Sequence, residues 1–180
     1  MIDAPTPLMR VLETPRLVLE PQTADHAEEM YAVLADPAIY EFENQPPVSV
    51  DALRERYGKL ESGRSPDGSE LWLNWVVRVR GGGPAMGYVQ ATVLADANAL
   101  IAYEFGSAWW GRGYAREATA VAIDELRGTY GVSAVGAVFK QSNHRSRKLL
   151  ERLGMRTAGP DEFPGGLAEA DEAAMVLFRG

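Results

Sequence analysis

Two glycines in the string Trp109–Thr119 (WWGRGYAREAT) stand where the chain could bind a phosphate group. An apolar run, Ala99–Phe105, precedes them, and a helix-favouring amphipathic run follows through Leu126. Gly111 and Gly113 therefore fall between a strand and a helix, where the absence of a Cβ lets the backbone turn tightly and approach a ligand. The first N–H groups of a helix and the positive end of its dipole attract anions. A glycine-rich turn without a ligand is the alternative that the spacing alone leaves open.

Two common phosphate loops do not match this stretch. The G-x-x-x-x-G-K-[ST] loop of nucleotide hydrolases does not occur in the sequence. The dinucleotide fingerprint G-x-G-x-x-G needs a third glycine where Arg116 stands, and it opens a βαβ unit early in a domain. Here the glycines come after several predicted strands.

What remains resembles the acetyl-CoA loop of the GNAT superfamily of N-acetyltransferases, [QR]-x-x-G-x-[GA], with Ala108 at the position of the usual Gln or Arg. A second stretch, Asn143–Met155, is similar to the N-x-x-S-x-x-x-L-E-x-x-G-[FM] helix of the same superfamily. A third, Thr14–Leu19 followed by Asp25 and Asp36-Pro37, resembles the opening of the ribosomal-protein N-terminal (Rim-type) acetyltransferase branch. These motifs occur in order and cover most of residues 14–179.

The resemblance implies a mixed α/β (α+β) GNAT-like fold in one domain over residues 1–180, with a core of about 14–179 and a leader of 1–13. It implies a central, mostly antiparallel mixed sheet of six to seven strands, about four flanking helices, and a gap between splayed strands four and five. Sequence periodicity and turn residues agree with this layout. Strands are predicted at 16–20, 71–80, 86–94, 99–105, 132–139 and 173–179, and helices from 24, from 50, after the glycine loop and at 143–153.

Composition excludes several other classes of function. The 180 residues suit one domain, and a formal net charge of −7 argues against non-specific nucleic-acid binding. The chain has no cysteine and only two histidines, so neither a thiolate nor a histidine-rich metal site is predicted. No apolar run approaches a membrane span and the first residues do not resemble a signal peptide, which predicts a cytoplasmic protein. A monomer and a homodimer both remain open.

Acetyl transfer to an amine needs the thioester held close and its carbonyl polarised. For binding acetyl-CoA, the backbone of Gly111–Ala115 is predicted to surround the pyrophosphate, with Arg112 adding charge, whereas Arg116 reads as an ordinary solvated helix residue. Asn143 reads as an N-cap, and the resemblance also places it on the cofactor arm. The cofactor-binding prediction thus comprises Tyr103, Phe105, Gly111, Arg112, Gly113, Tyr114, Ala115 and Asn143.

For catalysis, the resemblance implies that a backbone N–H in Tyr103–Phe105, with Phe105 as the candidate, polarises the carbonyl. Ser146 lies on the inward face of the downstream helix. Many members of the superfamily have a tyrosine near this position that gives a proton to sulfur, but Lys140–Met155 contains no tyrosine. Ser146 is therefore the candidate to relay a proton to sulfur. Glu104 is the candidate base, since partial burial beside the gap would raise the pKa of its carboxyl. Packing for Ser146 and solvent exposure for Glu104 are the alternative readings.

The resemblance implies that the connection between the first two helices borders the acceptor cleft. Glu41 and Glu43 there would attract a cationic amine, and Trp72, on the less buried face of its strand, would line the pocket. The acceptor is predicted to be a peptide or protein N-terminal α-amine or a small-molecule amine. A non-catalytic acyl-CoA-binding module, an antibiotic or polyamine acetyltransferase and a plain interaction domain are the alternatives.

Overall fold

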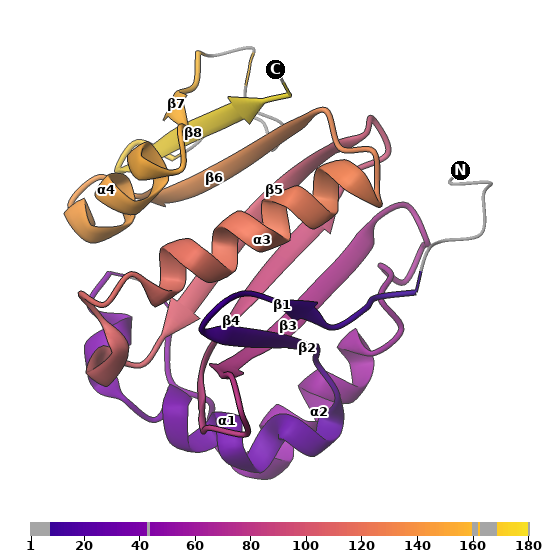
Figure 1. The fold of residues 1–180 in the computed structure, drawn as a ribbon, viewed down its shortest axis with the longest axis vertical. Coiled ribbons are helices and arrows are strands. Elements are labelled where there is room, and N and C mark those ends of the chain that lie inside the picture. Colours follow the sequence, from indigo (N-terminus) through magenta and orange to yellow (C-terminus); the bar gives the residue numbers. More distant parts are fainter. Residues whose placement is uncertain (1–7, 43, 160–161, 163–168, 180) are drawn as a thin grey trace.

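The computed structural model describes residues 8–42, 44–159, 162 and 169–179. Their strands form one mixed sheet in the order β1-β2-β3-β4-β5-β6-β8-β7 (Figure 1). All pairs are antiparallel except β5 with β6, which is parallel. The strands are β1 Leu12–Glu13, β2 Leu17–Pro21, β3 Leu71–Val79, β4 Ala85–Val93, β5 Asn98–Phe105, β6 Ala134–Lys140, β7 Arg156–Thr157 and β8 Glu172–Phe178. The predicted fold class, a mostly antiparallel mixed sheet with helices, is confirmed.

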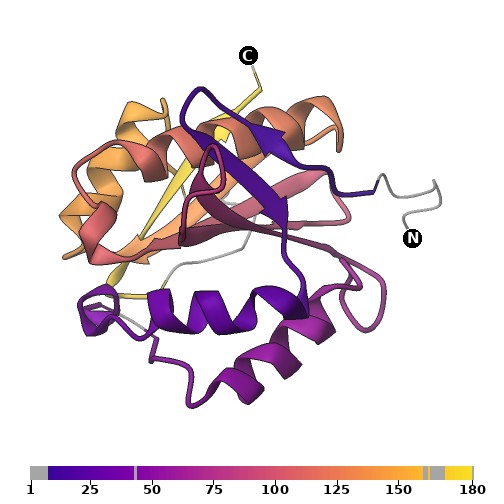
Figure 2. The ribbon, with the colours of Figure 1, turned by 60° about the horizontal axis from the view of Figure 1, so that its bottom comes forward.

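Helices cover both faces of the sheet. The helices α1 (Ala27–Leu34) and α2 (Val50–Leu60) lie on one face, and α3 (Tyr114–Gly128) and α4 (His144–Arg152) lie on the other (Figure 2). Three short 3-10 helices complete the described elements: η1 Ala24–His26, η2 Pro37–Tyr40 and η3 Ser107–Trp109. Among the described residues, every helix is too short or too polar to cross a lipid bilayer.

Strand β3 shows why two hydrophobic cores form. Its residues Leu73, Trp75 and Val77 pack in the core beneath α3, while Val76, on the opposite face, packs against α1 and α2. The expected alternation is present, yet the middle of the strand is buried on both sides because helices cover both faces. In α3, Ala118, Ala122 and Leu126 are fully buried at helical spacing.

The sheet opens between β5 and β6, as predicted for splayed strands four and five. The two strands pair only from Asn98 to Leu100 with Ala134 to Gly136. Beyond that register β5 continues to Phe105 beside β4, while β6 continues beside β8. A wedge between two otherwise regular strands results.

The sheet has eight strands within the described residues, against the six to seven predicted. The additional ones, β1 and β7, contain two residues each, too few to show a period of two. Strand β1 lies inside the stretch expected to be a leader, and Leu12 is buried on pairing with Leu19. The ordered sheet therefore begins earlier than the predicted core.

Candidate functional site

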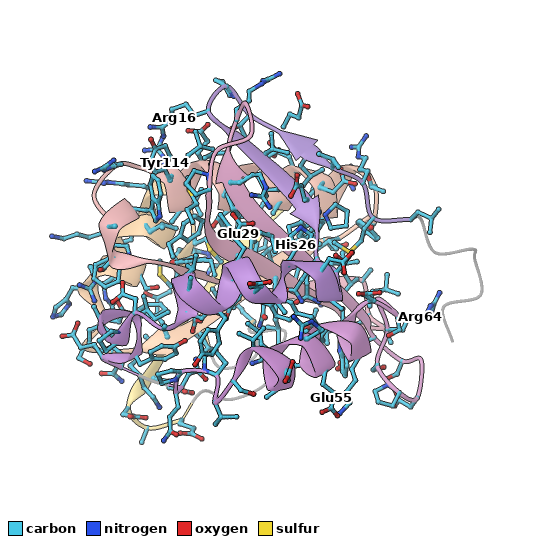
Figure 3. All side chains as sticks on the ribbon, turned by 90° about the horizontal axis from the view of Figure 1, so that it is seen from below. Arg16, His26, Glu29, Glu55, Arg64 and Tyr114 are labelled. Carbon is cyan, nitrogen blue, oxygen red and sulfur yellow. The ribbon has the colours of Figure 1, made fainter. Side chains whose placement is uncertain are left out.

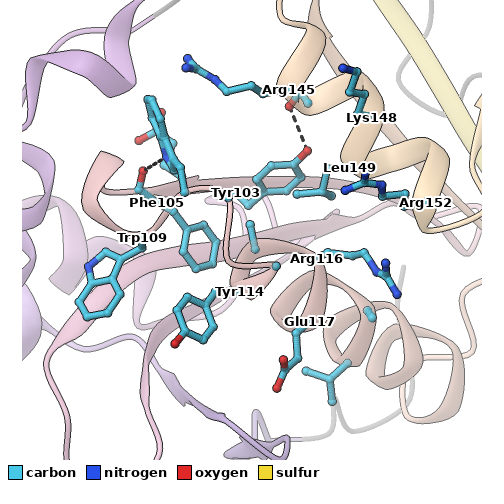
Figure 4. Close-up of a pocket in the computed structure, with 18 of the residues that line it drawn as sticks. Tyr103, Phe105, Trp109, Tyr114, Arg116, Glu117, Arg145, Lys148, Leu149 and Arg152 are labelled. Carbon is cyan, nitrogen blue, oxygen red and sulfur yellow. Dashed lines mark hydrogen bonds between the residues drawn. The ribbon is translucent and has the colours of Figure 1, made fainter.

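A cleft lies where β5 and β6 part (Figure 4). Its volume is about 870 Å³, and β5, the glycine loop, α3 and α4 line it. Ligand sites in proteins typically measure roughly 300–1,000 Å³. The predicted residues that line it are Tyr103, Glu104, Phe105, Gly111, Gly113, Tyr114, Ala115, Asn143 and Ser146. Arg112 is not among the lining residues, because its guanidinium lies over the ring of Trp109, 5.8 Å from its centroid.

The glycine loop has a backbone that requires glycine. Gly111 and Gly113 have φ angles of 74° and 78°, in the left-handed region. A Cβ on Gly111 would meet no atom within 4 Å, so conformation rather than crowding selects glycine there. Gly113 is the N-cap of α3, which begins at Tyr114. The helix therefore begins at the edge of the cleft, where the N–H groups of its first turn favour an anion.

A contact from Arg16, in the turn between β1 and β2, braces this loop. The guanidinium of Arg16 donates to the backbone oxygen of Arg112 at 3.0 Å and to the Glu117 carboxylate at 2.6 Å. It also stacks 4.5 Å from the ring centroid of Tyr114, the residue beside it in Figure 3. Burial raises the pKa of Glu117, but hydrogen bonds from Thr14 and Arg16 outweigh burial and hold that pKa below its ordinary value. Sequence reasoning missed this role of Arg16, although the Thr14–Leu19 motif marked the segment.

Four cations line the same cleft from α3 and α4. They are Arg116, Arg145, Lys148 and Arg152 (Figure 4), of which Arg145 is also near Glu41. Arg116, expected to be an ordinary solvated residue, thus belongs to the wall of the cavity. With Arg16, five cations line the cleft against four acidic residues, Glu13, Glu104, Glu117 and Asp124. In a protein with a net charge of −7, this small local excess of positive charge favours an anionic ligand.

A tyrosine and a serine meet inside the cleft. The hydroxyls of Tyr103 on β5 and Ser146 on α4 lie 2.9 Å apart, the contact dashed beside Tyr103 in Figure 4. Asn143 is the N-cap of α4, as predicted, and its Oδ1 accepts from the Ser146 N–H at 3.1 Å. Burial raises the pKa of Tyr103 to about 12, so the phenol stays protonated at neutral pH. Sequence reasoning assigned Tyr103 a cofactor-binding role only, because the candidate for proton relay was Ser146 on the helix.

The predicted acidic residues of the first inter-helix connection have different positions. Glu41 forms an ion pair with Arg145 at 2.8 Å, and that guanidinium stacks 3.9 Å from a Trp110 ring centroid at the mouth of the cleft. Glu41 is therefore engaged by a cation of the chain itself. Glu43 lies outside the described residues.

Glu104 stands between the cleft and a second cavity. This second cavity, of about 200 Å³, lies on the α1 and α2 side of the sheet, and Glu104 lines both. The Asn44 side-chain amide donates to the Glu104 carboxylate at 3.2 Å. Trp72 lines neither cavity, and its indole N–H donates to Glu70 at 2.9 Å in the turn before β3. The predicted base is thus at the cleft, and the predicted pocket tryptophan is not.

A family model described as an acetyltransferase (GNAT) domain matches residues 16–156. The chain belongs to the GNAT acetyltransferase family. It is 24% identical over 154 residues to the uncharacterized N-acetyltransferase YoaA of Bacillus subtilis. The matched stretch covers 83% of this chain and 84% of YoaA.

Solved structures of GNAT acetyltransferases share the fold at low identity. The ribosomal-protein-S5-alanine acetyltransferase from Vibrio fischeri is 17% identical, with a TM-score of 0.76 over 94% of this chain and 97% of that chain. The microcin C7 self-immunity acetyltransferase MccE, solved with acetyl-CoA and AMP, is 19% identical, with a TM-score of 0.71 over 92% and 94%. The predicted resemblance to the GNAT superfamily is confirmed, and with it an enzyme that uses acetyl-CoA as co-substrate, while the solved ribosomal-protein acetyltransferases share its fold.

The end of β5 directs backbone donors into the GNAT cleft. The Leu94 N–H donates to Asn98 and the Gly106 N–H donates to Met86, so even-numbered residues of β5 bond to β4. The N–H groups of Tyr103 and Phe105 therefore face the side on which β6 has diverged. The Phe105 carbonyl, on that same side, accepts from the Trp110 indole at 2.7 Å. The N–H groups of the segment that the resemblance singled out therefore point toward the gap between β5 and β6.

Proposed function

We propose that this GNAT enzyme transfers the acetyl group of acetyl-CoA to a primary α-amine, either a peptide or protein N-terminus or a small-molecule amine of similar pKa. The observation that carries the proposal is the position of Glu104, which lines both the large cleft and the smaller polar cavity. A cofactor on one side and an acceptor on the other would meet at this carboxylate.

The residues of the large cleft suit the anionic part of acetyl-CoA. The backbone of Gly111–Ala115 and the first turn of α3 would bind the pyrophosphate, and the cations Arg116, Lys148 and Arg152 would balance phosphate charge. Asn143 combines its cap on α4 with a place in the lining of the cleft. Bound acetyl-CoA supplies a thioester whose carbonyl carbon accepts the amine nitrogen.

The chain's own groups would handle the charges of that step. The N–H of Phe105 donates to the carbonyl oxygen as the C–N bond forms and the C–S bond breaks. Glu104 takes the proton that leaves nitrogen and passes it to water. The Tyr103 hydroxyl, positioned by Ser146, donates a hydrogen bond to the departing sulfur. Because a thiol has a pKa of roughly 8.5, far below that of Tyr103, sulfur leaves as a hydrogen-bonded thiolate without taking the phenol proton.

The protonation state of the acceptor favours an α-amine. A peptide α-amine has a pKa of about 7.7–8.0 and a lysine ε-amine about 10.4, so about a tenth of the former and fewer than one in a thousand of the latter are neutral at pH 7. Glu104, which lines both the cleft and the proposed acceptor cavity, already accepts a hydrogen bond from Asn44. Such a site suits an amine that is often neutral before it binds.

The test is a matched pair of short peptides supplied with acetyl-CoA at pH 7, with thiol release measured. One peptide has a free α-amine and a blocked lysine, and the other is acetylated at its first residue and has a free lysine. We expect faster release with the first. Faster release with the second refutes the α-amine assignment. Release with neither, while acetyl-CoA still raises the melting temperature, indicates the acyl-CoA-binding module instead.

A further inference from the structure

Amides and phenols supply most of the polar groups that line the second cavity, beside four apolar residues, Leu34, Pro47, Leu53 and Leu60. The strand register builds its floor, because Asn74 on β3 pairs with Gln90 on β4, Tyr88 pairs with Glu104, and the Gln22 N–H donates to the Asn74 carbonyl. The walls include Tyr57 from helix α2 and Tyr40, Asn44 and Gln45 from the connection before it. A cavity of this composition recognises hydrogen-bonding groups rather than apolar ones.

Two buried donors of this lining have no partner among the described residues. They are the Tyr57 hydroxyl and the Gln22 side-chain Nε2, in residues that are only 3% and 8% exposed. Burial raises the pKa of Tyr40 to about 12 and raises the pKa of Tyr57 above its ordinary value, so both phenols keep their protons at neutral pH. A buried donor without an acceptor is unfavourable, so a ligand oxygen that accepts hydrogen bonds from these two groups would bind favourably in the cavity.

The charges of the lining balance. Among the described residues that line it, two are charged, Arg56 and Glu104. The other cations of α2 are paired on the helix surface, Arg54 with Asp51 at 2.6 Å and Lys59 with Glu55 at 2.7 Å, whereas Arg56 has no ion pair within the described part of the chain. If Glu104 receives the amine, the remaining positive charge of Arg56 disfavours a cationic substituent and favours oxygen.

We propose that this cavity receives a compact, uncharged, hydroxyl-bearing substituent on the carbon next to the acceptor amine. A hydroxyl both donates and accepts, which matches amide groups that also do both and the two donors Tyr57 and Gln22. The cavity of about 200 Å³ has room for roughly six or seven non-hydrogen atoms at about 30 Å³ per water-sized group. The inference rests on the proposed function, because it places the amine at Glu104.

The experiment compares acceptors that differ by one hydroxyl. Thr and Val have nearly the same shape, so we use two peptides identical except for Thr or Val as first residue, and the free amides threoninamide and valinamide as small-molecule counterparts. We expect kcat/KM for the Thr acceptor to exceed that for the Val acceptor by roughly ten- to a hundredfold, since Val leaves the buried donors unmet. The pair that is acetylated distinguishes a peptide source from a free amine.

Two variants locate the preference. Tyr57→Phe removes the unpartnered cavity hydroxyl, and we expect it to reduce the Thr-to-Val ratio several-fold. Tyr130→Phe is the matched control, because its hydroxyl is also buried without a described partner but lines neither cavity. We expect the wild-type ratio there.

Equal use of Thr and Val, or a ratio that Tyr57→Phe leaves unchanged, overturns the inference while acetylation of the α-amine still upholds the proposed function. Acetylation of neither pair, with acetyl-CoA still bound, overturns both.

Discussion

Gly87 provides a direct test of whether the backbone of β5 sets the activity. It pairs with Phe105 across the β4–β5 ladder. A Cβ at this position would come within 2.1 Å of the Glu104 carbonyl oxygen, 2.8 Å of the Phe105 Cα and 2.9 Å of its Cγ. Ordinary contacts begin at 3.4 Å, so Gly87→Ala requires β5 to move by about 1.3 Å. The neighbour is backbone, so a rotamer change cannot relieve the contact.

Two measurable effects follow from that displacement. Forced overpacking costs about 1–3 kcal/mol, which for a chain of this length lowers the melting temperature by roughly 2–12 °C. The displaced segment carries Glu104 and the Phe105 N–H, and a misplacement of about 1 Å can cost on the order of a hundredfold in rate. We therefore expect kcat/KM to fall by more than the loss of folded protein explains, as measured at a temperature where the variant is fully folded.

Gly58→Ala is the matched control for the same chemical change. Gly58 lies within α2, and a Cβ there would meet nothing within 4 Å. Because glycine disfavours a helix interior by about 0.5–1 kcal/mol relative to alanine, the melting temperature should rise by about 1–4 °C with kcat/KM unchanged. Wild-type stability and wild-type kcat/KM in Gly87→Ala would refute the reasoning.

Two further predictions concern single side chains. Tyr103→Phe should lower kcat by about three- to tenfold with little change in KM for acetyl-CoA, because it removes one hydrogen bond to the departing sulfur; steady-state kinetics that show an unchanged kcat would leave Tyr103 with packing alone. Hydrogen bonds from Arg78, at 3.0 and 2.9 Å, hold the pKa of Glu29 below its ordinary value of 4.5. The ionised Glu29 carboxylate therefore contributes fully to the stability of the fold above about pH 4.5, and this contribution is lost as the pH falls through the lowered pKa. Glu29→Gln should flatten the acid side of a curve of melting temperature against pH, and parallel curves for variant and wild type would contradict this.

The sequence predicted those parts of the site that depend on neighbours in the chain. Gly111 and Gly113 predict a left-handed turn and Asn143 predicts a helix N-cap, because each residue determines the conformation or hydrogen bonding of backbone within a few residues of itself. The strand and helix positions followed from periodicity for the same reason. These features fix where a cofactor loop begins.

Contacts between distant segments could not be predicted in this way. The Tyr103–Ser146 pair spans 43 residues and depends on how α4 lies against the open end of β5. The Arg16 brace reaches 96 residues along the chain to the Arg112 carbonyl. Trp72 was predicted to line a pocket formed by distant segments, but its indole N–H donates to Glu70 in the adjoining turn. Register and packing decide such partners, and one sequence does not specify them.

Arg145 joins the two sides of the protein at the mouth of the cleft. It pairs with Glu41 from the connection between α1 and α2, and it stacks on Trp110, whose indole holds the Phe105 carbonyl. If a ligand on one side displaces Arg145, the free energy of binding for a ligand on the other side changes. Such coupling is reciprocal, so any factor by which acetyl-CoA tightens the acceptor is the factor by which the acceptor tightens acetyl-CoA. If acetyl-CoA and the acceptor bind on opposite sides of β5 as proposed, Arg145 is the residue whose contacts reach both sides.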